Sequence, residues 1–148
     1  MDIAIEPARQ PDVERLLHLS DEFALGLYPA DECFLLDVSE LEAPGVEVFV
    51  AREEGDAVGI AALVPHDGTA EMKRVFVEDR ARGRGIAAAL LEAVENAARA
   101  AGHPELLLET GPLSVGAIAL YEKHGYEHIP LFGQYIGSES SVCMRKRL

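Results

Sequence analysis

Residues 80–86 read "RARGRGI", so that three arginines and two glycines occupy seven positions of an acidic chain. The preceding residues 70–77, "AEMKRVFV", alternate in hydropathy and predict a strand. Apolar residues at helical spacing follow and predict a helix from 84 to 101. A glycine-rich turn between a strand and a helix leaves the first N–H groups of the helix unpaired at the positive end of its dipole. We therefore expect this turn to bind phosphate; the alternative is a helix start whose arginines face water.

The composition favours one domain spanning residues 1–148, with 49% hydrophobic and 26% charged residues. The formal net charge of −13 argues against nucleic acid or an anionic membrane as a partner. The charge is nevertheless uneven along the chain. Five of the 13 basic residues fall within twelve positions: Lys73, Arg74, Arg80, Arg82 and Arg84. A specific anion can bind at this basic cluster despite the overall charge.

The chain shows no targeting or membrane segment. No apolar run approaches the roughly 20 residues that a membrane-spanning helix needs. The first residues, "MDIAIEPARQ", lack the features of a signal peptide, and we expect a cytoplasmic protein. Cys33 and Cys143 are expected to be free thiols, and the sequence contains no metal-ligand spacing.

The order of predicted elements is strand, helices, antiparallel strands, helix, strand, helix and strands, which indicates an α/β or α+β domain with a mixed sheet. The expected strands cover residues 3–6, 46–53, 57–64, 70–77, 105–110, 126–130 and 141–148. The expected helices run from Pro11 until Pro29 ends the pattern, over 31–38, from 84 to 101, and from about 113 to 124.

Two other phosphate-binding motifs fit the loop less well. A P-loop requires a Lys-Ser/Thr pair after its last glycine, which the segment after Gly85 lacks. The stretch "GRGIAA" does satisfy the dinucleotide fingerprint G-x-G-x-x-G/A, with Glu109 near the position of a ribose ligand. However, fewer than 40 residues follow Glu109, and an antiparallel segment precedes the loop. A six-stranded dinucleotide-binding fold does not fit in this chain.

Two motifs together resemble the GNAT superfamily of acyl-CoA-dependent N-acetyltransferases. Residues 80–85 match its pyrophosphate motif Q/R-x-x-G-x-G/A, and "AIALYEKHGY" at 117–126 matches A-x-x-L-Y-x-x-x-G-Y/F. The resemblance is close over about residues 46–148 and rests on element order alone before them. It implies a mixed, mostly antiparallel central sheet flanked by helices, in which a splayed pair of strands forms the acyl-CoA cleft.

The resemblance also implies acetyl-CoA as the acyl donor and assigns residues to bind it. The backbone of residues 75–77 would pair with the pantetheine arm, and an N–H group there would polarise the thioester carbonyl. Ser114 stands where many members carry Asn, and the alternative role for it is a helix cap. The implied cofactor-binding residues are Val75, Phe76, Val77, Arg80, Arg82, Gly83, Arg84, Gly85, Ile86, Ala87 and Ser114.

The resemblance places three residues as candidates for the two proton transfers of the reaction. Tyr121 matches the tyrosine that protonates the departing thiolate; the alternative is a core aromatic residue. Glu71, on the strand that faces the acyl site, is the first candidate for the general base, and Glu109 is the second. For both glutamates the alternative is a solvated or salt-bridged side chain, and a water chain could take the proton instead.

The sequence therefore predicts an enzyme that transfers an acetyl group from acetyl-CoA to a primary amine, by direct attack in a ternary complex. A small-molecule acceptor is the first choice, and acceptor specificity is expected from residues 20–40 and 130–140. The alternatives are acetylation of a protein N-terminus or lysine, and a non-catalytic acyl-CoA-binding module that regulates a partner. The oligomeric state is left open, and pairing of exposed terminal strands into a homodimer is one alternative.

Overall fold

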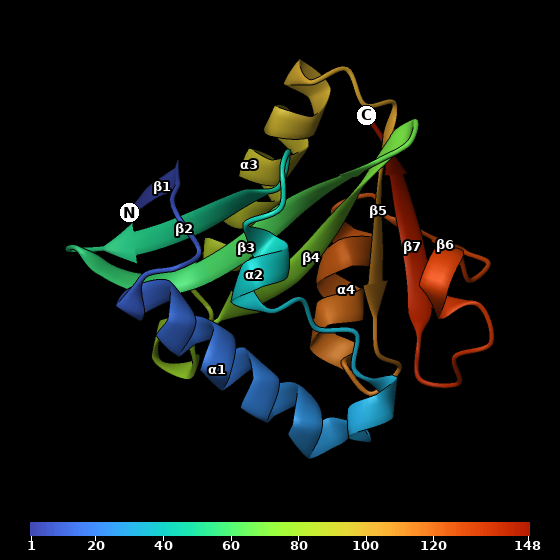
Figure 1. Ribbon diagram of the computed structural model, residues 1–148, viewed down its shortest axis with the longest axis horizontal. Helices are drawn as coiled ribbons and strands as arrows, with labels where there is room; N and C mark the ends of the chain where they lie inside the picture. Colours follow the sequence, from blue (N-terminus) through green and yellow to red (C-terminus); the bar gives the residue numbers. More distant parts are fainter.

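The strands of the computed structural model, which describes residues 1–148, form one seven-stranded sheet in the order β1-β2-β3-β4-β5-β7-β6 (Figure 1). Neighbouring strands are antiparallel, except for the parallel pair β4 and β5. This mostly antiparallel mixed sheet confirms the expected fold class. The strands are β1 (Asp2–Ile5), β2 (Glu47–Glu53), β3 (Asp56–His66), β4 (Thr69–Val77), β5 (Glu105–Thr110), β6 (Glu127–Ile129) and β7 (Val142–Arg147).

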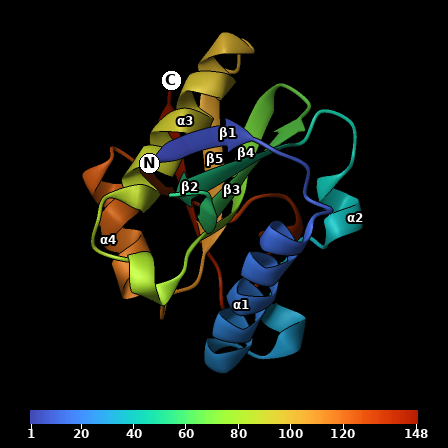
Figure 2. The ribbon, with the colours of Figure 1, turned by 90° about the vertical axis from the view of Figure 1, so that its left-hand side faces the viewer.

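Helices cover both faces of the sheet, and Figure 2 shows α1 and α2 on one side of it and α3 and α4 on the other. The helices are α1 (Pro11–Leu27), α2 (Val38–Leu41), α3 (Ile86–Ala100) and α4 (Val115–Lys123), with short 3-10 turns η1 (Ala30–Glu32), η2 (Asp79–Ala81) and η3 (Gly133–Tyr135). None of these helices is both long enough and apolar enough to cross a membrane.

The helix predicted over residues 31–38 is wrong. The chain forms η1 and then has no regular structure from 33 to 37, and α2 begins only at Val38. Asp37 starts α2 because its carboxylate accepts the N–H of Glu40 at 2.8 Å, while the Glu40 carboxylate accepts the N–H of Asp37 at 3.2 Å. This reciprocal capping box fixes the beginning of a helix rather than its middle.

Two apolar cores fill the spaces on the two faces of the sheet. One face packs residues such as Met72 and Leu108 against α3, and Tyr121 of α4 belongs to this core. The other face packs Ala62 against residues of α1 and α2. Because successive residues of a strand point to opposite faces, each strand contributes side chains to both layers.

The two parallel strands separate after a short paired segment. The pairs are Ala70 with Leu106, Glu71 with Leu107 and Met72 with Leu108, whereas β4 continues to Val77 and β5 to Thr110. The register between β3 and β4 shifts just beyond this point. Arg74 lies in the shifted segment with a φ of 58°. This bulge bends β4 away from β5, and the splayed strand pair is as expected.

Buried Arg74 ties the bulge to α1. Its Nη2 donates to the carbonyl oxygen of Leu17 at 3.0 Å. Its Nη1 lies 2.7 Å from Oδ1 of Asp21, an ion pair whose angles do not make a hydrogen bond. One side chain therefore links the bulge of β4 to the helix that covers one side of the cleft, in addition to the apolar core between them.

Candidate active site

A cavity of about 620 Å³ occupies the space between the separating strands. Its walls come from β4 and β5, from α1 and the segment after it, and from α3 and α4. The pair Met72 and Leu108 is the last pair before the strands diverge, so Lys73 and Glu109 are the first unpaired residues at the apex of the cleft. Both line the cavity.

The loop before α3 offers a row of free N–H groups. Gly83 and Gly85 have a φ of 79°, a conformation that favours glycine, and Gly85 precedes the first residue of α3. No backbone N–H of residues 83–88 donates to an acceptor in the protein. An added Cβ at either glycine would meet no atom within 4 Å, so the loop is open on that side. Such a row at a helix N-terminus fits a pyrophosphate.

The arginines of this loop are already paired with acidic residues. Arg84 Nη1 lies 2.7 Å from Glu53 Oε1, and Arg80 pairs with Glu78. Arg82 contacts Asp79 at 2.9 Å and donates from Nε to the carbonyl oxygen of Val77 at 3.0 Å. Of the three arginines only Arg82 lines the cavity.

Some of the other residues expected to bind the cofactor line the cavity, and some do not. Val75, Phe76, Val77, Ala87 and Ser114 line the cavity together with Arg82. Gly83, Gly85 and Ile86 do not line it, and neither do Arg80 and Arg84. The loop glycines instead belong to the row of free N–H groups beside the cavity.

The edge of β4 beyond Met72 has no strand partner on the β5 side. Residues 73–77 still pair with β3 on their other side, so they remain extended apart from the bulge. Such a half-paired strand can hold an extended ligand through its main chain. The residues expected to contact the pantetheine arm lie on this free edge.

Tyr121 lies in α4, lines the cavity and is 6% exposed. Its ring packs edge-on against Tyr126, with 5.8 Å between the centroids. Burial raises the pKa of the Tyr121 hydroxyl, and the nearby Glu109 raises it further. No protein group accepts a hydrogen bond from this hydroxyl. Tyr121 is therefore protonated at neutral pH and free to donate into the cavity.

Glu109 lies at the end of β5 with its carboxylate in the cavity wall. Burial raises its pKa to about 7, although the Ser141 hydroxyl, which donates to Oε2 at 2.7 Å, and the positive charge of Lys73 act in the opposite direction. The negative charge of Glu71 adds to the increase. A carboxyl group with this pKa can accept a proton near neutral pH.

The structure does not bring Glu71, the first candidate for the base, to the cavity wall. Glu71 is 2% exposed, and its Oε1 lies 2.9 Å from His66 Nε2. Its Oε2 accepts a hydrogen bond from the hydroxyl of Tyr135, which comes from η3 and covers this side of β4. The carboxylate therefore lies behind Tyr135 rather than facing a ligand.

Ser114 occupies the N-cap position of α4, but its side chain makes no capping hydrogen bond, which corrects that alternative. Its Oγ lies instead 3.0 Å from the hydroxyl of Tyr28, which also accepts the N–H of Leu113 at 3.0 Å. Tyr28 follows α1, so this contact connects the N-terminal segment to the loop between β5 and α4. It bridges the two arms of the cleft.

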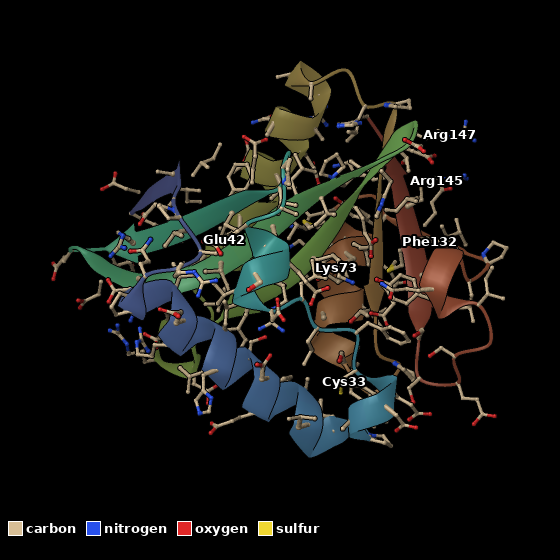
Figure 3. The ribbon with its side chains drawn as sticks, viewed as in Figure 1. Cys33, Glu42, Lys73, Phe132, Arg145 and Arg147 are labelled. Atoms are coloured by element: carbon tan, nitrogen blue, oxygen red, sulfur yellow. The ribbon has the colours of Figure 1, made fainter.

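The sequence predicts no role for Lys73 other than its membership of the basic cluster. The strand register indicates its role, because Lys73 directly follows the last residue pair between β4 and β5. That register depends on contacts between strands that are more than 30 residues apart. Lys73 lies near the centre of the molecule in Figure 3, and Cys33, another residue of the cavity wall, lies in the segment after α1.

Comparisons with known proteins identify the family of the chain. Residues 5–126 match the model of the acetyltransferase (GNAT) family. The chain is 41% identical over 148 residues to an IAA acetyltransferase of Azospirillum brasilense, covering 99% of this chain and 97% of that protein. An acyl-CoA N-acyltransferase from Klebsiella pneumoniae has a TM-score of 0.87 at 32% identity, with 99% and 97% of the two chains covered.

A third protein shows the same fold with its ligand present. A GNAT family acetyltransferase from Elizabethkingia anophelis, with acetyl-CoA bound, has a TM-score of 0.74 at 23% identity, covering 99% of this chain and 97% of that one. With the cleft, the row of free N–H groups and the two sequence motifs in place, these matches establish that the chain belongs to the GNAT family of acetyltransferases.

Proposed function

We propose that this acetyltransferase moves an acetyl group from acetyl-CoA to the primary amine of a small molecule, by direct attack in a ternary complex. The observation that carries the proposal is that Glu109 and Tyr121 line one cavity at the apex of the cleft. One has a pKa near neutrality and the other stays protonated, so a proton acceptor and a proton donor face the same space.

The chain's own groups fit acetyl-CoA, which supplies the activated acetyl thioester. The free N–H groups of residues 83–88 would hold the pyrophosphate, and the free edge of β4 would hold the pantetheine arm. Arg82, directly before these residues, and Ala87, one of them, line the cavity. This arrangement accounts for two glycines with positive φ directly before α3.

The two proton transfers are assigned to opposite faces of the sheet. Ala62 pairs with Lys73 and belongs to the core beneath α1, which puts Lys73 and its neighbour Glu109 on that face. Tyr121 packs with Met72 on the other face. In this proposal Glu109 removes the proton from the amine on the α1 side, and Tyr121 donates to the departing sulfur on the α4 side.

A small acceptor is favoured because the cavity is bridged on the side of α1. Tyr28 contacts Ser114, and the Ser140 hydroxyl donates to Glu32 Oε2 at 2.7 Å. Both contacts join the segment after α1 to the far wall, and all four residues line the cavity. A protein substrate would need a wider groove, and a non-catalytic module would need neither Glu109 nor Tyr121. The cytoplasmic location and the homodimer stay predictions.

The test is calorimetric titration of the purified protein with acetyl-CoA, followed by a thiol-release assay. The amine panel contains polyamines, amino acids, aminoglycosides and short peptides. Binding of acetyl-CoA with thiol release for a small amine is the expected result. Release only with peptides would favour protein acetylation instead, and binding without any release would favour the non-catalytic module.

A further inference from the structure

Lys73 carries a buried ammonium group that is incompletely hydrogen-bonded. The residue is 8% exposed, and its Nζ donates to the hydroxyl of Tyr135. Its other polar neighbour, Glu71 Oε2, lies 3.5 Å away without a hydrogen bond. An ammonium group has three N–H donors, so two of them find no acceptor in the protein. Because Lys73 lines the cavity, the acceptor for these N–H groups comes from the cavity, either from water or from a ligand that replaces it.

The surroundings hold Lys73 in place, because Tyr135 accepts one of its N–H groups and Glu71 forms an ion pair with it at 3.5 Å. Tyr135 is fully buried and packs edge-on against Phe34 and Phe132, with centroid distances of 4.9 and 5.2 Å. Its hydroxyl lies between Lys73 and Glu71, accepting from the first and donating to the second. The other oxygen of Glu71 is taken by His66. The position of the ammonium group is thus fixed by neighbours outside the cavity.

The remaining charged groups of the cavity wall have partners elsewhere. Arg74 pairs with Asp21 and Arg82 with Asp79. Glu32 accepts a hydrogen bond from Ser140. At the apex lie one cation, Lys73, and one carboxylate, Glu109, on neighbouring strands and on the same face of the sheet. Lys73 pairs with Glu71 outside the cavity and Glu109 accepts from Ser141, but two N–H groups of Lys73 have no acceptor in the protein.

We propose that the amine acceptor also carries a carboxylate, and that this carboxylate binds to Lys73 while the amine lies at Glu109. The acceptor class is therefore a small amino acid rather than a polyamine or an aminoglycoside. The last strand pair, Met72 with Leu108, lies about 5 Å apart, and Lys73 and Glu109 follow it directly. An amine and a carboxylate separated by one to a few carbon atoms suit side chains that start from this spacing. A second ammonium group would instead meet the positive charge of Lys73. This inference rests on the proposed N-acetyltransferase activity.

The experiment compares acceptors that differ only in the carboxylate. Thiol release is measured at pH 8 for several α- and β-amino acids, each beside its amide, with the wild type and Lys73→Met. We expect Lys73→Met to lower kcat/KM for the amino acids at least tenfold more than for their amides, mainly through KM, because any effect on Glu109 is common to both. An amino acid and its amide differ in the pKa of the amine. This difference cancels when kcat/KM of the variant is divided by kcat/KM of the wild type for the same substrate.

Two further variants control for folding and for the loss of any lysine. Lys73→Arg keeps the charge and should restore most of the preference for amino acids. Lys146→Met removes a lysine that pairs with Glu95 at 2.8 Å away from the cavity, and it should leave the preference unchanged. Calorimetric titration with acetyl-CoA shows whether each variant still binds the donor.

Equal loss of kcat/KM for acids and amides in Lys73→Met would overturn the inference, because Lys73 would then act on every acceptor alike. Preferential turnover of polyamines by the wild type would overturn it as well. Both of these results would leave the acetyltransferase activity standing. A protein that fails to bind acetyl-CoA at all would instead contradict the proposed function itself.

Discussion

The hydroxyl of Tyr28 lies 3.0 Å from Oγ of Ser114, and this contact joins the chain after α1 to the start of α4 across the mouth of the cleft. Gly111 is required beneath it, because an added Cβ there would lie 1.9 Å from the Tyr28 hydroxyl oxygen. The two arms of the cleft are therefore joined at this contact, which is possible because residue 111 has no side chain.

Removing the Tyr28 hydroxyl should destabilise the protein. Tyr28→Phe loses the hydrogen bonds to Ser114 and to the N–H of Leu113. We expect the free energy of unfolding in urea to fall by about 1–2 kcal/mol. Gly111→Ala should destabilise by displacing the same ring, so the double variant should lose less than the sum of the two single variants. If the losses of the two single variants add up to the loss of the double variant, Gly111 and the Tyr28 hydroxyl contribute to stability independently.

Gly83→Val should weaken acetyl-CoA binding at least tenfold. The new side chain would stand beside the free N–H groups of residues 83–88 in a conformation, φ of 79°, that valine disfavours. Gly68→Val is the matched control, because Gly68 has a φ of 75° and open space around it in the turn between β3 and β4. Calorimetry that finds equal acetyl-CoA affinity for the two variants would place the pyrophosphate elsewhere.

Tyr121→Phe should lower kcat about 100-fold or more while leaving the Kd for acetyl-CoA nearly unchanged. Only the proton donor is lost, because the ring stays packed against Tyr126. Tyr126→Phe is the control: its hydroxyl donates to Glu95 at 2.9 Å outside the cavity, so it should affect stability but not turnover. Full activity of Tyr121→Phe across the pH range would exclude the role of general acid.

The pH dependence of the wild type should report the ionisation of Glu109. A base must be ionised, and the pKa of Glu109 is raised to about 7, so kcat/KM should fall about tenfold per pH unit below that value. Glu109→Gln should lower kcat/KM and flatten the profile. Glu105→Gln, on the same strand but outside the cavity, should keep both rate and profile. An unchanged profile in Glu109→Gln would assign the base to another group.

The same carboxyl should reduce stability at alkaline pH. The folded protein keeps the proton of Glu109 up to about pH 7, whereas the unfolded chain releases it near pH 4.5. Between these values the folded state binds more protons, so the contribution of Glu109 to stability falls as the pH rises through this window. Glu109→Gln should therefore be more stable than the wild type at pH 8, by about 3 kcal/mol at most. The difference in denaturation midpoint between Glu109→Gln and the wild type should therefore be larger at pH 8 than at pH 4. The same difference at both pH values would contradict this.

The elements around residues 80–86 could be predicted because their signals are local. Alternation over 70–77, helical spacing after Gly85 and the two glycines each act within a few residues, and β4 and α3 follow these patterns. The capping box at Asp37 and Glu40 is equally local, and taking it into account would have placed α2 correctly. Residues 33–36 lie before this cap, so the helix expected over residues 31–38 begins only at Val38.

The site was harder to predict because its decisive contacts are not local. Glu71 faces the expected side of β4, but Tyr135, 64 residues later, covers it and accepts a hydrogen bond from Lys73. Burial raises the pKa of Glu109, while the hydroxyl of Ser141, in the segment before β7, acts in the opposite direction. Which of two glutamates faces a cavity depends on such contacts, and one sequence contains no pattern that reports them.

The opposite-face arrangement of Glu109 and Tyr121 also has a consequence for how such a protein can change over evolution. The donor side is built from sheet register, a helix start and backbone N–H groups, which depend on the main chain more than on particular side chains. The acceptor side uses the irregular segment 28–37 and residues 131–141, joined to the rest by a few side-chain contacts such as that of Ser140. Substitutions in these two loops can thus change the acceptor, while the residues that bind the coenzyme stay the same.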